Sequence, residues 1–331
     1  MLENKSILIT GGTGSLGQAL TKHILKKFPK IQRLIIFSRD EQKQYKMEQI
    51  FTEKKYPMMR YFLGDVRDRE RLIRAFKEVD VVIHAAAMKH VHLAEYNPDE
   101  CIKTNVEGAQ NVIHAALENE VSEVVALSTD KACAPVNLYG ATKLVSDKLF
   151  IAANNIRGHT KIKFSVVRYG NVMGSNGSVI PFFLKNRHKG KLPVTDINMT
   201  RFNISLNDGV LMVMYAIQNA WGGEVFIPKI RSYRILDVVK AIAPECKVEI
   251  IGIRPGEKLH EEMITSSDSF NTYDLGSYYV IAPQTPRWEI KKYIETFNAK
   301  LVSQGFRYSS GENDEWESVD SLKKLIAEKV N

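Results

Sequence analysis

The sequence predicts an α/β fold in which a doubly wound parallel sheet is followed by a smaller C-terminal domain. From residue 6 to about 170, short apolar runs rich in β-branched residues alternate with longer helical patterns, which is typical of βαβ units. A glycine-rich turn follows the first apolar run, and the alternation ends after Gly170. With 331 residues, of which 44% are hydrophobic and 25% charged, the chain is long enough to bury both parts.

The predicted strands are nearly continuous in apolar character, as expected for a sheet that helices cover on both faces. They span residues 7–10, 34–37, 60–63, 81–84, 124–128 and 164–168. Six such strands suit a Rossmann-like sheet. Residues 206–220 predict a helix and residues 224–227 a strand that could return to the main sheet.

Two domains are predicted from where this pattern changes. The first comprises residues 1–172 with about 204–228, and the second about 173–203 with 229–331. A glycine- and serine-rich stretch at 174–178 lies at their boundary, and a C-terminal helix is expected over 319–330. We expect the first domain to bind a dinucleotide and the second to bind the substrate.

Composition and charge exclude several classes of partner. The formal net charge of +8 favours polyanions, but acidic residues are interleaved with basic ones, so we expect phosphate-bearing small molecules and no nucleic acid. No apolar run approaches the roughly 18 residues that span a bilayer, and no signal peptide opens the chain, which predicts a cytoplasmic protein without a membrane partner. Three distant cysteines and eight histidines without a ligand motif predict reduced thiols and no metal site.

The glycine-rich turn stands directly between the first strand and the first helix. Backbone without side chains can approach a pyrophosphate, whose charge the free N–H groups and the positive dipole end of that helix attract. A glycine cluster alone could be only a tight turn, but this position favours a dinucleotide site. The residues assigned to it are Gly11, Thr13, Gly14, Ser15, Leu16 and Gly17.

The end of the second strand favours NADP over NAD. NAD-binding chains usually carry an acidic residue here, whereas this chain has Ser38 and Arg39, which can receive a 2′-phosphate, with Lys43 one helical turn further on. Asp40 argues the other way. Asp65 follows the third strand, where its side chain could reach the adenine or cap a helix.

A tyrosine and a lysine predict the redox chemistry. Tyr139 and Lys143 are four residues apart in a predicted helix, so their side chains share one face. A nearby ammonium favours the phenolate, so we expect the pKa of Tyr139 to fall from its usual value of about 10 towards working pH. Tyr139 could then accept a hydroxyl proton while hydride leaves for the nicotinamide. The spacing is common by chance, and its place after a strand ending in Thr129 makes it specific.

At these residues the chain resembles the extended short-chain dehydrogenase/reductase family, whose members carry TGxxGxxG, a Ser or Thr after the fifth strand, and YxxxK. Four further segments resemble the inverting UDP-N-acetylglucosamine 4,6-dehydratases, namely AAAMKHV at 85–91, AEYNP at 94–98, STDKAC at 128–133 and RPGEK at 254–258. The resemblance covers most of the chain and is strongest before residue 210.

This resemblance implies an NADP-dependent lyase that acts on UDP-N-acetylglucosamine. The implied product is a UDP-2-acetamido-2,6-dideoxy-4-keto-hexose of L-arabino configuration, for surface or flagellar glycans of the pseudaminic acid type. The resemblance also implies a homo-oligomer built from dimers, up to a hexamer. It adds cofactor contacts at Val66, Ala85, Ala86 and Lys89.

The implied reaction needs a second acid/base pair. Oxidation at C4 makes the C5 hydrogen acidic, so that a base can remove it while an acid protonates the departing C6 hydroxyl, and hydride then returns to C6. Asp130 and Lys131 are the candidates, provided the chain turns there, because neighbours on a regular strand point to opposite faces. We expect burial near the nicotinamide and Lys143 to lower the pKa of Lys131 so that it acts as the base, with Asp130 holding the proton. An ordinary Asp-Lys surface turn is the alternative.

The predicted residues fall into two groups besides the cofactor site. The catalytic group is Thr129, Asp130, Lys131, Tyr139 and Lys143. By resemblance, the substrate-binding group is Lys89, Thr129, Tyr169, Asn171, Val179, Thr195, Met199, Arg201, Arg254 and Glu257. Two positions depart from the family pattern: Asn176 stands where relatives carry Arg, and Asn203 where they carry Trp. His84 and His90 are expected to pack or to lie in loops.

Two other functions remain open. A UDP-sugar 4-epimerase would use Tyr139 and Lys143 but would need no Asp130–Lys131 pair. A non-catalytic protein that senses NADP or binds nucleic acid could share the same fold. The complete set of Thr129, Tyr139 and Lys143 argues against the non-catalytic alternative.

Overall fold

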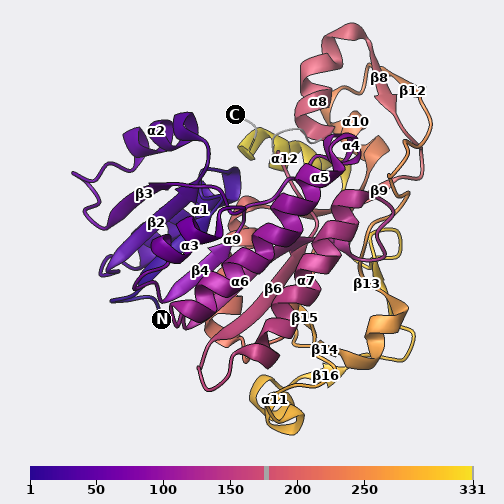
Figure 1. Cartoon of the computed structure of the whole chain (residues 1–331). Coiled ribbons are helices and arrows are strands. Elements are labelled where there is room, and N and C mark those ends of the chain that lie inside the picture. The colour runs from indigo at the N-terminus through magenta and orange to yellow at the C-terminus, as the bar shows by residue number, and fades with distance from the viewer. Residues whose placement is uncertain (175–178, 330–331) are drawn as a thin grey trace.

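The computed structural model describes residues 1–174 and 179–329, and a large parallel sheet forms its centre (Figure 1). The six predicted strands form with bounds shifted by one residue at most. They are β1 (Ser6–Thr10), β2 (Arg33–Ser38), β3 (Met59–Leu63), β4 (Val81–His84), β5 (Glu123–Thr129) and β6 (Lys163–Tyr169). Their spatial order, β3-β2-β1-β4-β5-β6, is that of a doubly wound dinucleotide-binding sheet.

Within the described residues, four more strands extend this sheet beyond β6. As predicted, β10 (Val225–Pro228) returns to it and pairs parallel with β6. Strands β15 (Tyr278–Ile281), β14 (Thr272–Asp274) and β16 (Lys300–Leu301) then add in antiparallel fashion. The predicted second domain is therefore wrong in this part, because residues 272–301 contribute strands to the main sheet. The rest of the domain division stays a prediction.

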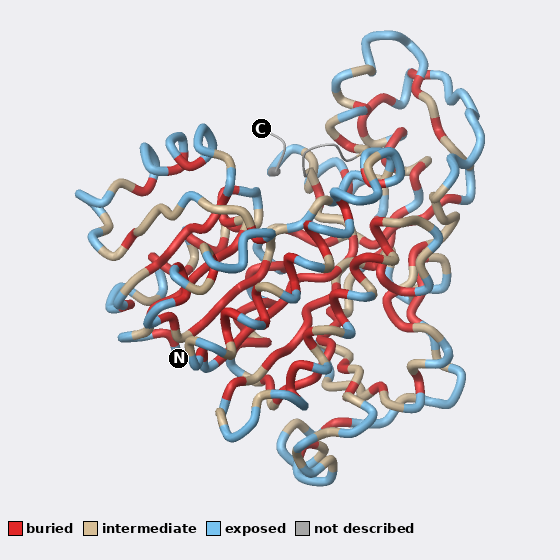
Figure 2. The backbone as a smooth tube through the Cα atoms, in the orientation of Figure 1, coloured by how far each residue is buried: buried red, intermediate tan, exposed pale blue. Residues whose placement is uncertain are grey.

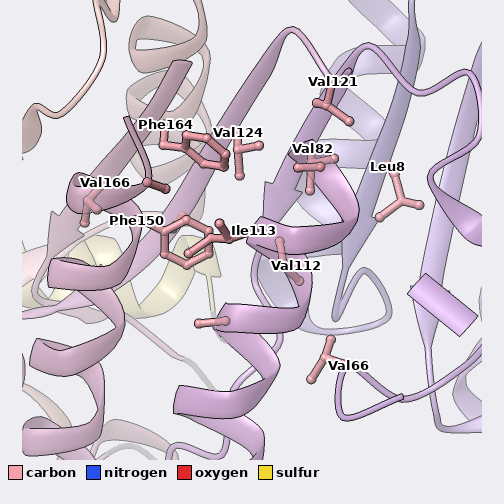
Figure 3. Packing of buried hydrophobic residues seen from close by; sticks show 14 of the residues in the cluster. Leu8, Val66, Val82, Val112, Ile113, Val121, Val124, Phe150, Phe164 and Val166 are labelled. Atoms are coloured by element: carbon pink, nitrogen blue, oxygen red, sulfur yellow. The ribbon is translucent and has the colours of Figure 1, made fainter. Parts of the chain in front are cut away.

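Helices cover both faces of the sheet. One face carries α3 (Arg69–Ala75), α6 (Gly108–Glu118) and α7 (Leu138–Ile156), and Figure 3 shows Ile113 of α6 and Phe150 of α7 beside Phe164 of β6. The other face carries α1 (Ser15–Lys27), α2 (Glu41–Ile50), α9 (Leu206–Asn219) and, at its end, α11 (Ile290–Phe297). In β1, Leu8 faces the first layer while Ile7 and Ile9 face the second, which explains why the strands are apolar at every position. Figure 2 shows that burial follows the strands.

A smaller region with its own core lies beside the carboxyl ends of the strands. Its core contains Phe183, Leu192, Tyr233 and Val238. Its elements are α8 (Val179–Asn186), η3 (Arg187–Lys189), β8 (Lys191–Val194), β9 (Thr200–Ile204), β11 (Ser232–Arg234), α10 (Ile235–Ile242), β12 (Lys247–Ile250) and α12 (Val319–Lys329). Strands β13 (Glu262–Ile264) and β17 (Tyr308–Ser309) pair with each other and pack on the core of the main sheet, and η4 (Ser266–Asn271) lies beside β15 and β16. Strand β9 pairs with β11 and with β7 (Asn171–Val172), which follows β6 directly and so joins this region to the main sheet.

Four short helical segments lie between β4 and α7 in the sequence. They are α4 (Val91–Tyr96), α5 (Pro98–Ile102), the π-helical turn η1 (Lys103–Glu107) and the 3₁₀ turn η2 (Asp130–Ala132). Among the described residues, no helix combines the length and the apolar character needed to span a membrane.

Candidate active site

The predicted cofactor residues meet where β1 and β4 lie side by side, the point at which strand order reverses and doubly wound sheets bind their ligands. Gly11 has a φ of +66°, and a Cβ atom there would lie 2.8 Å from the Cα of Ala86. A Cβ on Gly17 would collide with the carbonyl oxygen of Gly12. Only glycine therefore allows the turn after β1 to approach both the loop after β4 and helix α1.

This turn presents the N-terminus of α1 without a side chain over it. Gly14 is the N-cap residue, and Ser15 and Leu16 begin the helix. Thr13 is buried, and its hydroxyl lies 3.0 Å from that of Ser38 at the end of β2. Ser38 thus holds the turn in place, and a dinucleotide pyrophosphate fits the exposed backbone of Gly14 and Ser15.

The charged residues after β2 leave both Arg39 and Lys43 exposed to solvent. Asp40 is the N-cap of α2 and accepts a hydrogen bond from the Lys43 backbone at 3.0 Å, and the Lys43 ammonium also lies 3.0 Å from its carboxylate. The Arg39 side chain is 61% exposed and lies 3.5 Å from Asp65. The capping role of Asp40 explains an acidic residue here without a ribose contact.

Asp65 does not cap a helix, so that alternative is wrong. Its carboxylate pairs with Arg67 at 2.8 Å and with Arg39, while Asp68 caps α3. Those two arginines hold the pKa of Asp65 below its ordinary value although burial raises it. Val66 is buried against Gly108, where a Cβ would lie 2.8 Å from the valine side chain.

The loop after β4 is tied to β1 and to helix α7. The Thr10 hydroxyl lies 2.8 Å from Nδ1 of His84, and the backbone of Ala86 donates to the same hydroxyl. Burial lowers the pKa of His84 to about 3, as expected for a packing residue. Ala85 and Ala86 bring the chain from here to Lys89.

Sequence reasoning missed Asn105, which anchors this loop. Its amide exchanges hydrogen bonds with the backbone of Met88 at 2.8 and 2.9 Å and donates to Thr142 at 3.0 Å. It lies in the π-helical turn η1, a feature that often marks functional sites. An asparagine within a helical pattern gave no signal of this role.

The predicted tyrosine and lysine lie together on the buried face of α7. Asn137 caps this helix by accepting from the Gly140 backbone at 2.7 Å, and Tyr139 and Lys143 are 8% and 3% exposed. The expected fall in the pKa of Tyr139 is wrong for this arrangement. Burial raises this pKa to about 12, although the charge of Lys131 and a hydrogen bond with Thr129 both lower it. Burial also lowers the pKa of Lys143.

A buried polar cluster beneath these residues holds α7 on the sheet. The Ser128 hydroxyl donates to Asp147 at 2.7 Å, and Arg168 pairs with the same carboxylate at 3.2 Å. Arg168 also donates to the carbonyl of Met263 in β13 at 3.0 Å. Asp147 lies one turn after Lys143, so the helix that carries the tyrosine is fixed through this cluster.

The chain turns at Asp130 and Lys131, which meets the geometric condition for a shared acid/base role. These residues form the 3₁₀ turn η2, capped by Thr129, and Ala134 follows with a left-handed φ of +42°. The Lys131 ammonium lies 3.0 Å from Asp130 and 3.2 Å from Asn171. Asp130 is fully buried, which a surface turn would not require.

The protonation expected for Lys131 is wrong. Burial lowers its pKa, as predicted, but Asp130 and Glu261 outweigh burial and raise it. Burial, followed by the charge of Glu261, raises the pKa of Asp130, and this outweighs the lowering effect of Lys131. Lys131 is thus an ammonium held between the carboxyl groups of Asp130 and Glu261, and the raised pKa of Asp130 agrees with the expectation that Asp130 holds a proton. Glu261, 3.2 Å from Lys131, was missed because a glutamate in the polar run after RPGEK carries no distinguishing signal.

The structure brings some of the predicted substrate residues to this centre and leaves others apart. Tyr169 lies near Tyr139, and burial followed by that neighbour raises the pKa of its hydroxyl. Arg201 is buried and donates to the carbonyls of Thr200 and Leu259 at 2.6 and 3.2 Å. Val179, Thr195 and Met199 belong to the smaller region, where the Thr195 hydroxyl lies 3.0 Å from the Met199 sulfur.

The RPGEK loop contacts the residues that lie, in the sequence, between Asp130–Lys131 and Tyr139–Lys143. Asn137 donates to the carbonyl of Gly256 at 2.7 Å, and Lys258 donates to that of Cys133 at 2.6 Å. Arg254 is 61% exposed and pairs with Glu257 at 3.8 Å. The exposed guanidinium is placed where it can meet an anionic ligand.

The structure describes only one of the two positions at which the sequence departs from the family pattern. Asn203 donates to Glu317 at 3.1 Å and lines a cavity of about 360 Å³ at the end of β10. Asn176 lies outside the described residues.

Three comparisons with known proteins bear on this site. The profile of the family described as "Polysaccharide biosynthesis protein" matches residues 7–283. The UDP-N-acetylglucosamine 4,6-dehydratase (inverting) of Campylobacter jejuni subsp. jejuni serotype O:2 is 55% identical over 333 residues, covering 98% of each chain. The UDP-glucose 4-epimerase of Rickettsia akari is 39% identical over 333 residues, covering 98% of this chain and 96% of the relative. The X-ray structure of Pen from Bacillus thuringiensis has a TM-score of 0.89 at 36% identity, covering 99% of each chain.

Proposed function

Because the chain belongs to the polysaccharide biosynthesis protein family, we propose that it is a nucleotide-sugar enzyme, and specifically an NADP-dependent UDP-N-acetylglucosamine 4,6-dehydratase that inverts C5. The observation that carries this proposal is the meeting of two acid/base pairs, Tyr139 with Lys143 and Asp130 with Lys131, in one buried site. The 55% identity to a relative of that name supports it.

The cofactor would be held by the turn after β1 and by the loop after β4. Gly11, Gly14 and Ser15 offer backbone to the pyrophosphate, and the exposed Arg39 offers a guanidinium to a 2′-phosphate, which supports NADP. When bound, the nicotinamide supplies a hydride acceptor that later becomes the donor.

The chain's own residues divide the proton transfers. Tyr139, bonded to Thr129, takes the C4 hydroxyl proton, and the nearby Lys131 supplies positive charge that favours a phenolate. Lys143 is assigned to the same step by its place four residues further along α7. Asp130 and Lys131 serve the elimination, in which the C5 proton is removed and the C6 hydroxyl leaves as water after gaining a proton. Asn171 holds the Lys131 side chain towards the same site.

The nucleotide would bind on the side of the smaller region. Arg254 and Glu257 of the RPGEK loop are the proposed contacts to the diphosphate and ribose, and Arg201 with Tyr169 lies nearer the sugar. The dimer-based homo-oligomer, the cytoplasmic location and the pseudaminic acid pathway remain predictions from the resemblance.

A mass measurement separates dehydration from epimerisation, the activity named for the Rickettsia akari relative. The protein is incubated with UDP-N-acetylglucosamine and a catalytic amount of NADP. A dehydratase yields a product lighter by one water, with no external reductant and no accumulation of NADPH. An epimerase yields an isomer of unchanged mass, and net NADPH formation would indicate a simple dehydrogenase.

A further inference from the structure

Glu261 is a buried carboxylate whose position is fixed by the backbone around it. It lies between the RPGEK loop and β13 and is 2% exposed. Its backbone N–H donates to the Ser310 hydroxyl at 2.9 Å, and the Ser310 N–H donates to the Glu261 carbonyl at 2.8 Å. The main chain is therefore held in place independently of the glutamate side chain.

The side chain of Glu261 points at Lys131. Its Oε1 lies 3.2 Å from the Lys131 ammonium and 3.8 Å from Nε of Arg201. Its Oε2 is buried and accepts no hydrogen bond from the described residues. A buried carboxylate with an unpaired oxygen costs stability, so packing alone does not explain it.

The cluster around Lys131 is a chain of alternating charges. Asp130 and Glu261 flank the ammonium, Arg201 lies on the far side of Glu261, and Lys258 adds a more distant positive charge. Tyr233 faces the cluster from β11. Burial raises the pKa of Glu261, but Lys131 and Arg201 outweigh it, so the carboxylate is ionised.

Glu261 lies closer to Lys131 than to Arg201. Nη1 of the Arg201 guanidinium donates to two backbone carbonyls, and its Nε lies 3.8 Å from Glu261, against 3.2 Å for the Lys131 ammonium. Lys131 has three partners, Asp130, Asn171 and Glu261, which match the three hydrogens of an ammonium. Among the described residues, Glu261 is the only one of these three partners of Lys131 that comes from later in the chain than β7.

We propose that Glu261 is a positioning residue of the elimination step, which holds the Lys131 side chain between Asp130 and Asn171 and sets how firmly Lys131 keeps its proton. This inference rests on the proposed role of Lys131. Glu261 contacts neither the dinucleotide turn nor Tyr139, so it acts directly on the elimination and reaches the first oxidation only through the charge of Lys131.

The test compares Glu261→Gln with Glu261→Asp and with the matched control Glu262→Gln, the next carboxylate along the chain. In Glu261→Gln, we expect product formation to fall roughly 10- to 100-fold, less than the 10²- to 10⁴-fold contribution of a general acid or base itself. The pH profile of elimination should shift to lower pH by about one unit or more, because Lys131 loses an opposite charge. Glu261→Asp should restore the profile's position, and Glu262→Gln should match wild type.

Two further readouts separate this role from a structural one and from failure of the proposed function. NADP affinity should stay at wild-type level in Glu261→Gln and the transient NADPH signal should rise above it, because reduced cofactor accumulates when elimination slows, whereas a merely structural defect would lower both. Lysine side-chain NMR, with the Lys131 signal identified by its loss in Lys131→Met, should show Lys131 titrating at lower pH in Glu261→Gln, whether or not the wild type dehydrates the sugar. An unchanged Lys131 titration, or wild-type elimination in Glu261→Gln, would overturn the inference.

Discussion

Replacing Gly140 by alanine should separate the two acid/base pairs. Gly140 follows Tyr139 in the first turn of α7, and a Cβ atom there would collide with the carbonyl oxygen of Lys131 and lie 3.1 Å from the Pro135 side chain. The obstacle is backbone, so it cannot rotate away, and overpacking of this kind costs about 1–3 kcal/mol. Alanine's helix preference returns up to ~1 kcal/mol. We expect the free energy of unfolding to fall by about 1–2 kcal/mol.

The matched control is Gly209→Ala, in the interior of α9, where the nearest contact of a Cβ would be an ordinary 3.5 Å from Leu16. This change should leave stability unchanged or raise it by up to ~1 kcal/mol. Urea unfolding and product formation are measured for both variants. Because Gly140→Ala moves α7 away from Lys131, it should lose activity as well as stability. Equal stability and activity in the two variants would refute the packing argument.

The remaining predictions concern charge. Arg39→Ala should weaken NADP binding roughly 10- to 100-fold, the scale of a lost charge-assisted hydrogen bond, while NAD binding stays constant in a parallel titration. Tyr139→Phe should block the first oxidation, whereas Lys131→Met and Lys131→Arg should give transient NADPH absorbance without product; near-normal product from Lys131→Arg would remove Lys131 from proton transfer. Burial raises the pKa of Glu123 from 4.5 to about 7. The contribution of its protonated form to stability is therefore present below pH 4.5 and lost as the pH rises to 7. When the free energy of unfolding is measured across this pH range, Glu123→Gln should show a smaller loss than the wild type.

The main sheet could be predicted because its first six strands are largely apolar and the first five are each followed by a helical segment. The strands β14 and β16 could not, because they are three and two residues long and pair with partners set by the whole fold. Such short segments carry no periodicity. Resemblance to a family, which the comparisons confirm, added the expected reaction and site residues but neither of these strands.

Within the site, residues adjacent in the chain were easier to predict than their partners. Thr129, Asp130 and Lys131 were found together, and the turn they need is present. The protonation of Lys131 was predicted in the wrong direction because two carboxyl groups oppose burial, the neighbouring Asp130 and Glu261, which lies 130 residues further along the chain. Burial was anticipated, but neither opposing charge was weighed against it.

NMR of the wild-type protein with UDP-N-acetylglucosamine and NADP in deuterated water tests the central claim most directly. If Asp130 and Lys131 carry out elimination beside Tyr139, the spectra should show a 6-deoxy-4-keto sugar with deuterium from solvent at C5 and inverted configuration there. A product that keeps its C6 hydroxyl and its original C5 hydrogen, changed only at C4, would contradict the account and leave Tyr139 and Lys143 as the sole acid/base pair in use.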